Sequence, residues 1–294
     1  MTNTHPVSEE LIGRLIDLSR RAGAAIMEIY TNKDSHQVQH KSDESPLTAA
    51  DLAAHRLISA ELPLLLPLPI ISEEAALPEF ADRQLWDTYW LVDPLDGTKE
   101  FIAGNGEFTV NIALIQRGRP LLGVVHVPVT DVTYLGVLNA REDRSIGAFK
   151  FTGGEGRQPI SVRSLIERYK QKQSFTVLLS HRAGTQATVD LMETITHNWP
   201  GEIETTNAGS SLKFCVIAEG KADFYPRFAP TSEWDTAAAQ AVLEAAGGRV
   251  VRAAGELPPL IYNASEDMLN PYFFALGDKH FAWGQLLSSS ALVS

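Results

Sequence analysis

Residues 90–98 read Trp-Leu-Val-Asp-Pro-Leu-Asp-Gly-Thr, an apolar run that stops abruptly at carboxylates. The apolar residues predict a buried strand that ends at Asp93 and Asp96. Pro94 fixes its own backbone and favours an extended Asp93, while Gly97 lets a ligand approach the backbone closely. Two acids at a strand end suit a hard cation such as Mg²⁺, which prefers oxygen ligands. Asp-Pro and Asp-Gly are also ordinary turn dipeptides, so these residues alone leave a surface turn open as the alternative.

A second apolar run ends in acids in the same way. Residues 69–72, Pro-Ile-Ile-Ser, predict a short buried strand, and Glu73 follows it directly. One such strand end is usually a solvated loop, but two in one region favour a shared metal site. Asp235, at the start of a predicted Ala-rich helix, is a further candidate, with helix capping as its alternative role. None of the candidate acids is accompanied by Cys or His, which favours Mg²⁺ or Mn²⁺ over zinc.

Composition and charge exclude several classes of protein. The chain has 294 residues, 44% of them hydrophobic, which is enough for one large domain or two ordinary ones. Its formal net charge of −11 argues against nucleic-acid binding, which needs a basic face. An anionic substrate would therefore need a local cationic site or metal ions. The single cysteine, Cys215, permits no intrachain disulfide and fits a reducing compartment.

The sequence predicts no integral membrane segment. Residues 1–10 lack the hydrophobic region of a signal peptide. The most apolar segment, residues 62–71, is too short to span a bilayer and contains prolines. We therefore expect a cytoplasmic protein, either free or peripheral on the cytoplasmic face of the inner membrane. The sequence leaves its oligomeric state open.

Periodicity and turn residues predict helices and a sheet in the N-terminal half. Helices are expected after Ser8, up to Tyr30, and from about Ala49 to Leu62, with Ser8 and Thr48 as N-caps. Strands are expected at residues 37–41, 108–115, 121–127, 132–138 and 148–152. Their succession predicts an antiparallel sheet. The glycines after Thr152 predict a boundary between an N-terminal α+β half, residues 1–153, with most metal ligands, and a C-terminal α/β half, residues 154–294.

Strands and helices alternate in the C-terminal half. Strands are expected at residues 175–180, 203–206 and 222–225, from Arg249 and from Leu260. Helices are expected at residues 186–196, 212–219 and 232–246, and from His280. Ser211 is the expected N-cap of helix 212–219, and the same helix start could also face a substrate.

A predicted helix start beside the acids offers a site for an anion. The short helix expected at residues 99–103 would point backbone N–H groups at the space in front of Asp96 and Gly97. Converging carboxylates repel one another unless cations neutralise them. Metals next to a helix N-terminus form a clamp for phosphoryl transfer to water. From the residues alone, the chain is interpreted as a Mg²⁺-dependent phosphate-ester hydrolase.

Three segments resemble the signature segments of the inositol monophosphatase superfamily. They are Glu73-Glu74, Asp93-Pro-Leu-Asp-Gly-Thr98 and Trp234-Asp235, which occur in this order at suitable distances. Longer stretches are similar to the bacterial 3′(2′),5′-bisphosphate nucleotidase branch of this superfamily, namely residues 45–51, 90–115, 209–215 and 225–228. The resemblance covers almost the whole chain and leaves residues 288–294 as an unassigned tail.

The resemblance implies a fold and a metal centre. The fold would be of the α+β class, a layered α-β-α-β-α sandwich of the inositol monophosphatase and fructose-bisphosphatase type. Mg²⁺ would occupy two or three sites, with Mn²⁺ as a possible substitute and Li⁺ as an inhibitor. The implied ligands are Glu73, Asp93, Asp96, Asp235 and the backbone carbonyl of Leu95.

The resemblance also implies which residues act on the substrate. Gly97 and Thr98 would donate N–H bonds to the phosphate being cleaved. Thr98, paired with Asp43, would activate the attacking water, and Glu73 would take part in catalysis. The implied substrate contacts are Leu95, Asp96, Gly97, Thr98, Ser210, Ser211, Lys213, Arg227 and Asp235.

Two cations and one departure from the family pattern bear on substrate choice. Lys213 and Arg227 are candidates for holding a second phosphate and the nucleoside, with solvated surface cations as the alternative. Ala239 stands where the family pattern usually has Gly, a change that leaves the metal ligands untouched.

The function implied by the resemblance is hydrolysis of adenosine 3′,5′-bisphosphate to AMP and phosphate, a reaction associated with sulfur assimilation. A sulfated relative of this nucleotide is a second expected substrate. The alternatives are an inositol or sugar monophosphatase with the same chemistry, and a non-catalytic protein that binds metal and nucleotide.

Overall fold

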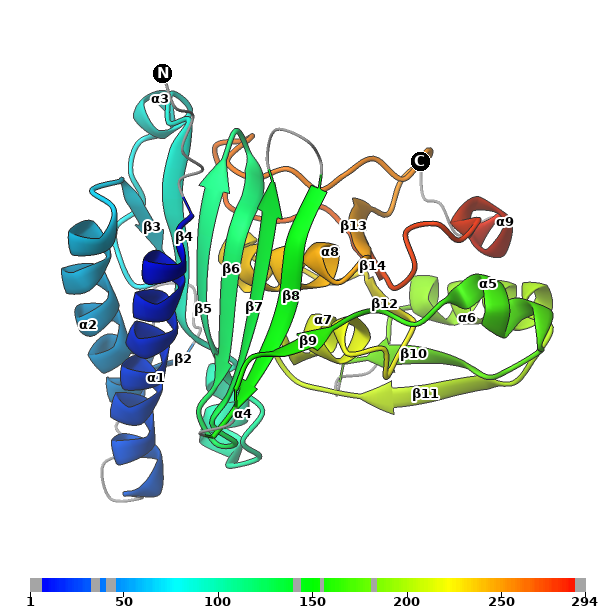
Figure 1. Ribbon diagram of the computed structural model, residues 1–294, viewed down its shortest axis with the longest axis horizontal. Helices are drawn as coiled ribbons and strands as arrows, with labels where there is room; N and C mark the ends of the chain where they lie inside the picture. Colours follow the sequence, from blue (N-terminus) through cyan, green and yellow to red (C-terminus); the bar gives the residue numbers. More distant parts are fainter. Residues whose placement is uncertain are drawn as a thin grey trace.

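The computed structural model of the protein describes residues 7–32, 38–40, 46–139, 144–153, 156–180 and 184–288. Two large sheets and their helices form α-β-α-β-α layers (Figure 1), which confirms the predicted fold class. The helices are α1 (Glu9–Thr31), α2 (Ala49–Leu65), α3 (Phe80–Arg83), α4 (Thr98–Ala103), α5 (Leu165–Lys170), α6 (Gln186–Asn198), α7 (Leu212–Ala218), the 3₁₀ helix η2 (Glu233–Asp235), α8 (Ala237–Ala245) and α9 (Trp283–Leu287).

The first large sheet has seven strands in sequence order. They are β3 (Ile70–Ser72), β4 (Thr88–Asp96), β5 (Thr109–Gln116), β6 (Arg119–Val127), β7 (Val132–Asn139), β8 (Arg144–Thr152) and β9 (Gln158–Ile160). Strands β3 and β4 are parallel and the remaining neighbours antiparallel. The antiparallel succession predicted from the sequence is therefore confirmed. A separate antiparallel pair joins β1 (Val38–His40) and β2 (Pro46–Thr48).

The second large sheet has five strands in the order β11-β10-β12-β14-β13. These are β10 (Phe175–Leu179), β11 (Ile203–Asn207), β12 (Phe224–Arg227), β13 (Arg249–Arg252) and β14 (Phe273–Leu276). Strand β10 is parallel to β11 and β12, and β14 is antiparallel to β12 and β13.

Three apolar clusters hold the layers together. One lies between α1, α2 and the seven-stranded sheet, one surrounds α7 and α8 between the two sheets, and one lies between the five-stranded sheet and α5, α6 and α9 (Figure 1). The two N-terminal helices begin as predicted, because the Ser8 hydroxyl accepts a hydrogen bond from Leu11 N at 3.1 Å and Thr48 forms a capping box with Asp51.

Helix α8 packs on β6 and β7 at glycines. A Cβ atom added at Gly123 would lie 2.1 Å from Ala238 O, and one added at Gly136 would lie 2.3 Å from Ala241 O. Only glycine therefore lets the backbones approach this closely, and the Ala-rich sequence of α8 supplies the matching small surface. Ala239 is fully buried in α8, where its methyl group belongs to the core between the sheets.

Two predicted elements of the C-terminal half differ from the structure. The helix expected at residues 232–246 divides into η2 and α8, because the Asp235 side chain accepts the Ser232 N–H at 2.9 Å and closes a tight turn first. The strand predicted from Leu260 is wrong: residues 253–272 form no named strand, and the next strand along the chain is β14, residues 273–276, which lies between β12 and β13. Two prolines at 258–259 lack N–H donors, which disfavours regular pairing there.

Residues beyond position 153 contribute to the first sheet. Strand β9 pairs with β8, and α8 packs against β6 and β7 from the opposite side to α1. The division into halves at residue 153 stays a prediction.

Among the described residues, no helix combines the length and the apolarity that crossing a bilayer requires.

Helix α1 crosses β6 closely above a buried histidine. A Cβ atom at Gly23 would lie 2.5 Å from the ring of His126, which is 2% exposed and lies 2.9 Å, through Nδ1, from Thr133 Oγ1. Burial lowers the pKa of His126 from 6.5 to about 4, against an opposing effect of Asp131.

We expect this histidine to destabilise the protein in acid. The unfolded chain takes up a proton near pH 6.5 and the folded protein only near pH 4, so stability is complete above pH 6.5 and falls as pH drops between these values. The loss should approach roughly 3 kcal/mol. Urea unfolding of wild type and His126→Gln between these pH values measures it. Equal pH slopes for the two proteins would contradict the prediction.

Candidate active site

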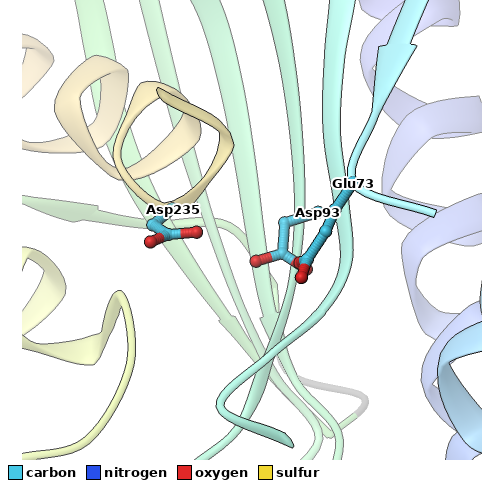
Figure 2. A group of neighbouring side chains, drawn as sticks. All are labelled: Glu73, Asp93 and Asp235. Atoms are coloured by element: carbon cyan, nitrogen blue, oxygen red, sulfur yellow. The ribbon is translucent and has the colours of Figure 1, made fainter. Parts of the chain in front are cut away.

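The candidate site lies where β3 and β4 end. Their parallel pairing sets Ser72 beside Val92, so that Glu73, just past the end of β3, and Asp93, still within β4, come next to each other. Asp235 approaches from η2 on the other side (Figure 2). One carboxylate oxygen from each of these three acids lies within 4.8 Å of the other two.

The electrostatics of this cluster fit a bound cation. Burial and the neighbouring charges of Glu73, Asp96 and Asp235 raise the pKa of Asp93 well above its usual value. The pKa of Asp235 is also raised well above normal, by burial and by Asp96 and Glu73. Asp93 Oδ2 is buried and has no hydrogen-bond partner among the described residues. A divalent cation would satisfy this oxygen and remove the repulsion, and an all-carboxylate set suits Mg²⁺ or Mn²⁺.

Asp96 lies beside the three-acid group and is held by Ser211. Its Oδ2 accepts hydrogen bonds from Ser211 N at 2.6 Å and from Ser211 Oγ at 2.9 Å. Burial raises the pKa of Asp96 to about 6, while the Lys213 charge and the Ser211 bonds oppose the rise. Leu95 lines the same cavity, in an irregular part of β4 where the register with β5 shifts. The predicted ligands are thus brought to one place, and their coordination of a metal stays a prediction.

Gly97 turns the chain from β4 into α4. Its φ of 95° lies in the left-handed region, where glycine is unstrained, and a side chain there would also meet Glu107 O at 3.1 Å. Gly97, Thr98 and Glu100 line the cavity. The start of α4 therefore lies next to the acids, as the sequence predicts.

Thr98 pairs with Asp51. Thr98 Oγ1 donates to Asp51 Oδ1 at 3.2 Å, and Asp51 Oδ2 accepts the N–H of Thr48 at 2.8 Å. Asp51 is 1% exposed, and burial raises its pKa. The predicted partner, Asp43, lies outside the described residues. Sequence reasoning missed Asp51, although its spacing from Thr48 is that of a capping box and was a usable signal.

The turn at residues 208–211 brings further predicted residues to the site. Ser210 lines the cavity with a φ of 42°, and its Oγ is buried with no hydrogen-bond partner among the described residues. Ser211 precedes α7, but the predicted N-cap bond is wrong. Its hydroxyl donates to Asp235 O at 2.6 Å, because the acids of the site compete for it.

Lys213 is buried rather than solvated. Its side chain contacts the turn, with Nζ donating to Ala208 O at 3.0 Å and Ser210 O at 2.8 Å. Burial lowers its pKa to about 8, while Asp96 opposes the fall. The alternative that Lys213 is a solvated surface cation is therefore wrong, and its substrate role stays a prediction.

Arg227 faces the cavity from the end of β12. Its guanidinium donates to Ala229 O at 3.0 Å, Ser180 Oγ at 2.9 Å and Pro230 O at 3.0 Å. These bonds orient the guanidinium, and a guanidinium carries five N–H donors in all. Donors therefore remain for an anionic ligand.

The cavity that these residues line has a volume of about 860 Å³. The carboxylates and the start of α4 form one part of its wall. Phe228, Pro230, Trp234 and Leu269 contribute apolar surface to another part. The space is in the range of sites for drug-sized ligands, well beyond what a phosphate group alone would need.

Comparison with known proteins agrees with this geometry. The model of the inositol monophosphatase family matches residues 8–278. The chain belongs to the inositol monophosphatase family. Metal dependence is typical of this family, in agreement with the acidic cluster.

Similar members of the inositol monophosphatase family have a more specific name. The 3′(2′),5′-bisphosphate nucleotidase CysQ of Shigella flexneri is 45% identical over 264 residues, which are 90% of this chain and 98% of that protein. The protein of the same name from Escherichia coli strain K12 is 44% identical with the same coverage. The crystal structure of CysQ from Bacteroides thetaiotaomicron superposes with a TM-score of 0.76 at 41% identity, covering 90% of this chain and 96% of that one.

Metal binding is expected to stabilise this member of the inositol monophosphatase family. A ligand at about 100 times its Kd adds about 2.7 kcal/mol to the free energy of unfolding, which corresponds to roughly 5 °C in Tm or more. Differential scanning fluorimetry of EDTA-treated protein, with and without saturating Mg²⁺, measures this shift. Asp235→Asn should abolish it, whereas Asp190→Asn on the exposed side of α6 should leave it intact. If neither Mg²⁺ nor Mn²⁺ changes the Tm of the wild type, the metal centre is refuted.

Proposed function

We propose that this chain is a Mg²⁺-dependent phosphomonoesterase that hydrolyses adenosine 3′,5′-bisphosphate to AMP and phosphate. The observation that carries the proposal is the meeting of three buried or half-buried carboxylates with the Thr98–Asp51 pair at one cavity. The name shared by relatives that cover nearly the whole chain supports the choice of a nucleotide substrate.

Metal and protein groups would divide the chemistry. Mg²⁺, when bound, would neutralise the phosphate and lower the pKa of a water molecule. The residues proposed to hold it are Glu73, Asp93, Asp96, Asp235 and, through its carbonyl, Leu95.

The protein's own groups position the attacking water and the phosphate. Thr98 Oγ1 gives its proton to the hydrogen bond with Asp51, so its lone pairs can accept a hydrogen bond from a water in the cavity. The raised pKa of buried Asp51 suits it to take up a proton passed through Thr98. The N–H groups of Gly97 and Thr98 begin α4, where the first N–H groups of a helix lack intrahelical partners and favour an anion.

The remaining cavity wall fits the other parts of a nucleoside bisphosphate. Arg227 would clamp the second phosphate with its free donors, and Lys213 would add positive charge near the turn. Such local cations are needed because the whole chain carries a formal charge of −11. An inositol monophosphate has no second phosphate for Arg227 and no base for the apolar part of the cavity wall.

A substrate panel tests the proposal. Phosphate release is measured from adenosine 3′,5′-bisphosphate, its sulfated relative, inositol-1-phosphate and AMP, each with Mg²⁺, with Mn²⁺, with Li⁺ added and with EDTA. We expect Mg²⁺-dependent release from the bisphosphate, little from AMP, and inhibition by Li⁺. A large preference for the inositol ester would overturn the nucleotide assignment, and tight binding without turnover would favour a non-catalytic protein.

A further inference from the structure

The turn at residues 208–211 is clamped by two residues that the proposed chemistry does not use, Asn111 on β5 and Glu107 in the segment just before that strand. Glu107 Oε2 accepts the N–H of Gly209 at 2.6 Å. Asn111 Nδ2 donates to Ser211 Oγ at 2.9 Å. One contact therefore holds the backbone at the start of the turn, and the other holds the side chain at its end.

Ser211 transmits this clamp to the acids. Its N–H and hydroxyl hold Asp96, and the hydroxyl also donates to Asp235 O at 2.6 Å. Ser211 is 1% exposed and lies behind the acids, and it is not among the described residues that line the cavity. A hydroxyl has one proton and can rotate. Accepting a hydrogen bond from Asn111 fixes its orientation, so that its proton points at the two acidic segments.

One of the two clamping residues, Asn111, shares the seven-stranded sheet with the metal candidates Asp93 and Asp96, and Glu107 lies two residues before β5. Asn111 on β5 pairs in register with Asp93 on β4, so that their side chains emerge on the same face. The close fit at Gly209 marks the other contact, since a Cβ there would lie 2.9 Å from Glu107. Asp93 and Asp96 come from the seven-stranded sheet, whereas Asp235 and the turn come from the C-terminal half. The clamp therefore sets the position of Asp235 relative to Asp93 and Asp96.

The chemistry of Asn111 points to function rather than stability. The residue is 1% exposed, and its Oδ1 has no hydrogen-bond partner among the described residues. A half-satisfied buried amide stabilises a core less than an apolar side chain of the same size would. Retaining such an amide at this position is understandable if its donor orients Ser211.

From this geometry we infer that Glu107 and Asn111 are positioning residues, which hold the 208–211 turn so that Asp96 and Asp235 meet around the metal. This inference rests on the proposed function for its effect on turnover. Its effect on metal binding does not depend on which substrate is cleaved. Replacing a residue that orients metal ligands typically lowers metal affinity or activity about 10- to 100-fold.

The test compares Glu107→Ala, Glu107→Gln and Asn111→Leu with Thr133→Val, which removes a buried hydrogen bond of β7 away from the site. Mn²⁺ affinity is measured by titration calorimetry, kcat and KM by phosphate release, and Tm by calorimetry without metal. We expect Glu107→Ala and Asn111→Leu to lower Mn²⁺ affinity or kcat about 10- to 100-fold. Glu107→Gln keeps the acceptor for Gly209 and should restore most of the loss.

Stability separates positioning from a structural role. Asn111→Leu should leave Tm close to wild type, whereas Thr133→Val should lower Tm and leave Mn²⁺ affinity and kcat unchanged. Wild-type Mn²⁺ affinity and kcat in both Glu107→Ala and Asn111→Leu would overturn the inference. So would equal losses in Glu107→Gln and Glu107→Ala. If Asn111→Leu does not fold, the Glu107 pair still decides, and if the wild type cleaves no substrate, the Mn²⁺ titration decides alone.

Discussion

Replacing Asp93 by Asn is expected to lower kcat about 10³-fold, a loss of about 4 kcal/mol in transition-state stabilisation. Asp93 is 1% exposed, lies within reach of Glu73 and Asp235, and leaves Oδ2 without a partner among the described residues. We therefore expect its charge to hold a cation. The amide keeps the shape and removes that charge. Phosphate release from adenosine 3′,5′-bisphosphate and Mg²⁺ titration calorimetry measure the two losses together.

The fold should survive this substitution. Because a charge buried among other acids is removed, the Tm of metal-free Asp93→Asn should equal or exceed that of the wild type. Asp87→Asn, at the exposed residue just before β4, is the matched control and should change neither kcat nor Mg²⁺ affinity. Near-normal turnover by a folded Asp93→Asn protein would contradict the assignment of Asp93 as a ligand.

Removing the Thr98 hydroxyl should give the second large loss of activity. Thr98→Ala is expected to lower kcat about 10²- to 10³-fold, because general acid–base help contributes in this range. Mg²⁺ affinity should stay near that of the wild type, since Thr98 bonds Asp51 and no other carboxylate in the described part of the chain. Thr98→Ser, which keeps the hydroxyl, should recover most of the activity. Stopped-assay kinetics at saturating Mg²⁺ measure the series.

A double-mutant cycle identifies the partner of Thr98. If Thr98 and Asp51 act as one unit, Asp51→Asn combined with Thr98→Ala should be no slower than the worse single variant. Additive losses would show separate roles. Asp43→Asn belongs in the same series, because the resemblance to the family implied Asp43 as the partner. Loss of activity in Asp43→Asn with normal Asp51→Asn kinetics would return the role to Asp43.

Local patterns in the sequence predicted most of the elements correctly. Apolar periodicity identified α1, α2 and strands β3 to β8 of the first sheet but missed β9, and the side chains of Ser8 and Thr48 do cap their helices. These signals are local, because capping and amphipathic burial depend on residues a few positions apart. The prediction of a strand from Leu260 failed because the segment pairs with β13 only through an isolated bridge between Val251 and Pro259, which does not continue into a ladder.

The sequence predicted some residues of the candidate site and missed others. Glu73, Asp93 and Asp96 were found because apolar strands that end in carboxylates are visible in the sequence, and Asp235 was found at a predicted helix start. Lys213 was a candidate because it follows the helix start at Ser211, but its burial was not foreseen. Asn111 and Glu107 were missed as functional residues because their hydrogen-bond partners lie 100 and 102 positions away in the sequence.

The order of residues therefore determined the types of ligand, their strand ends and the helix that starts beside them, since each depends on chemistry within a few positions. The tertiary structure decided which hydroxyl, amide and carboxylate face one another across the two halves. Asp235 lies near Asp93, and Ser211 contacts Asp96, in a structure where α8 packs on the glycines of β6 and β7. Contacts of this kind follow from the packing of layers, which no short stretch of sequence specifies.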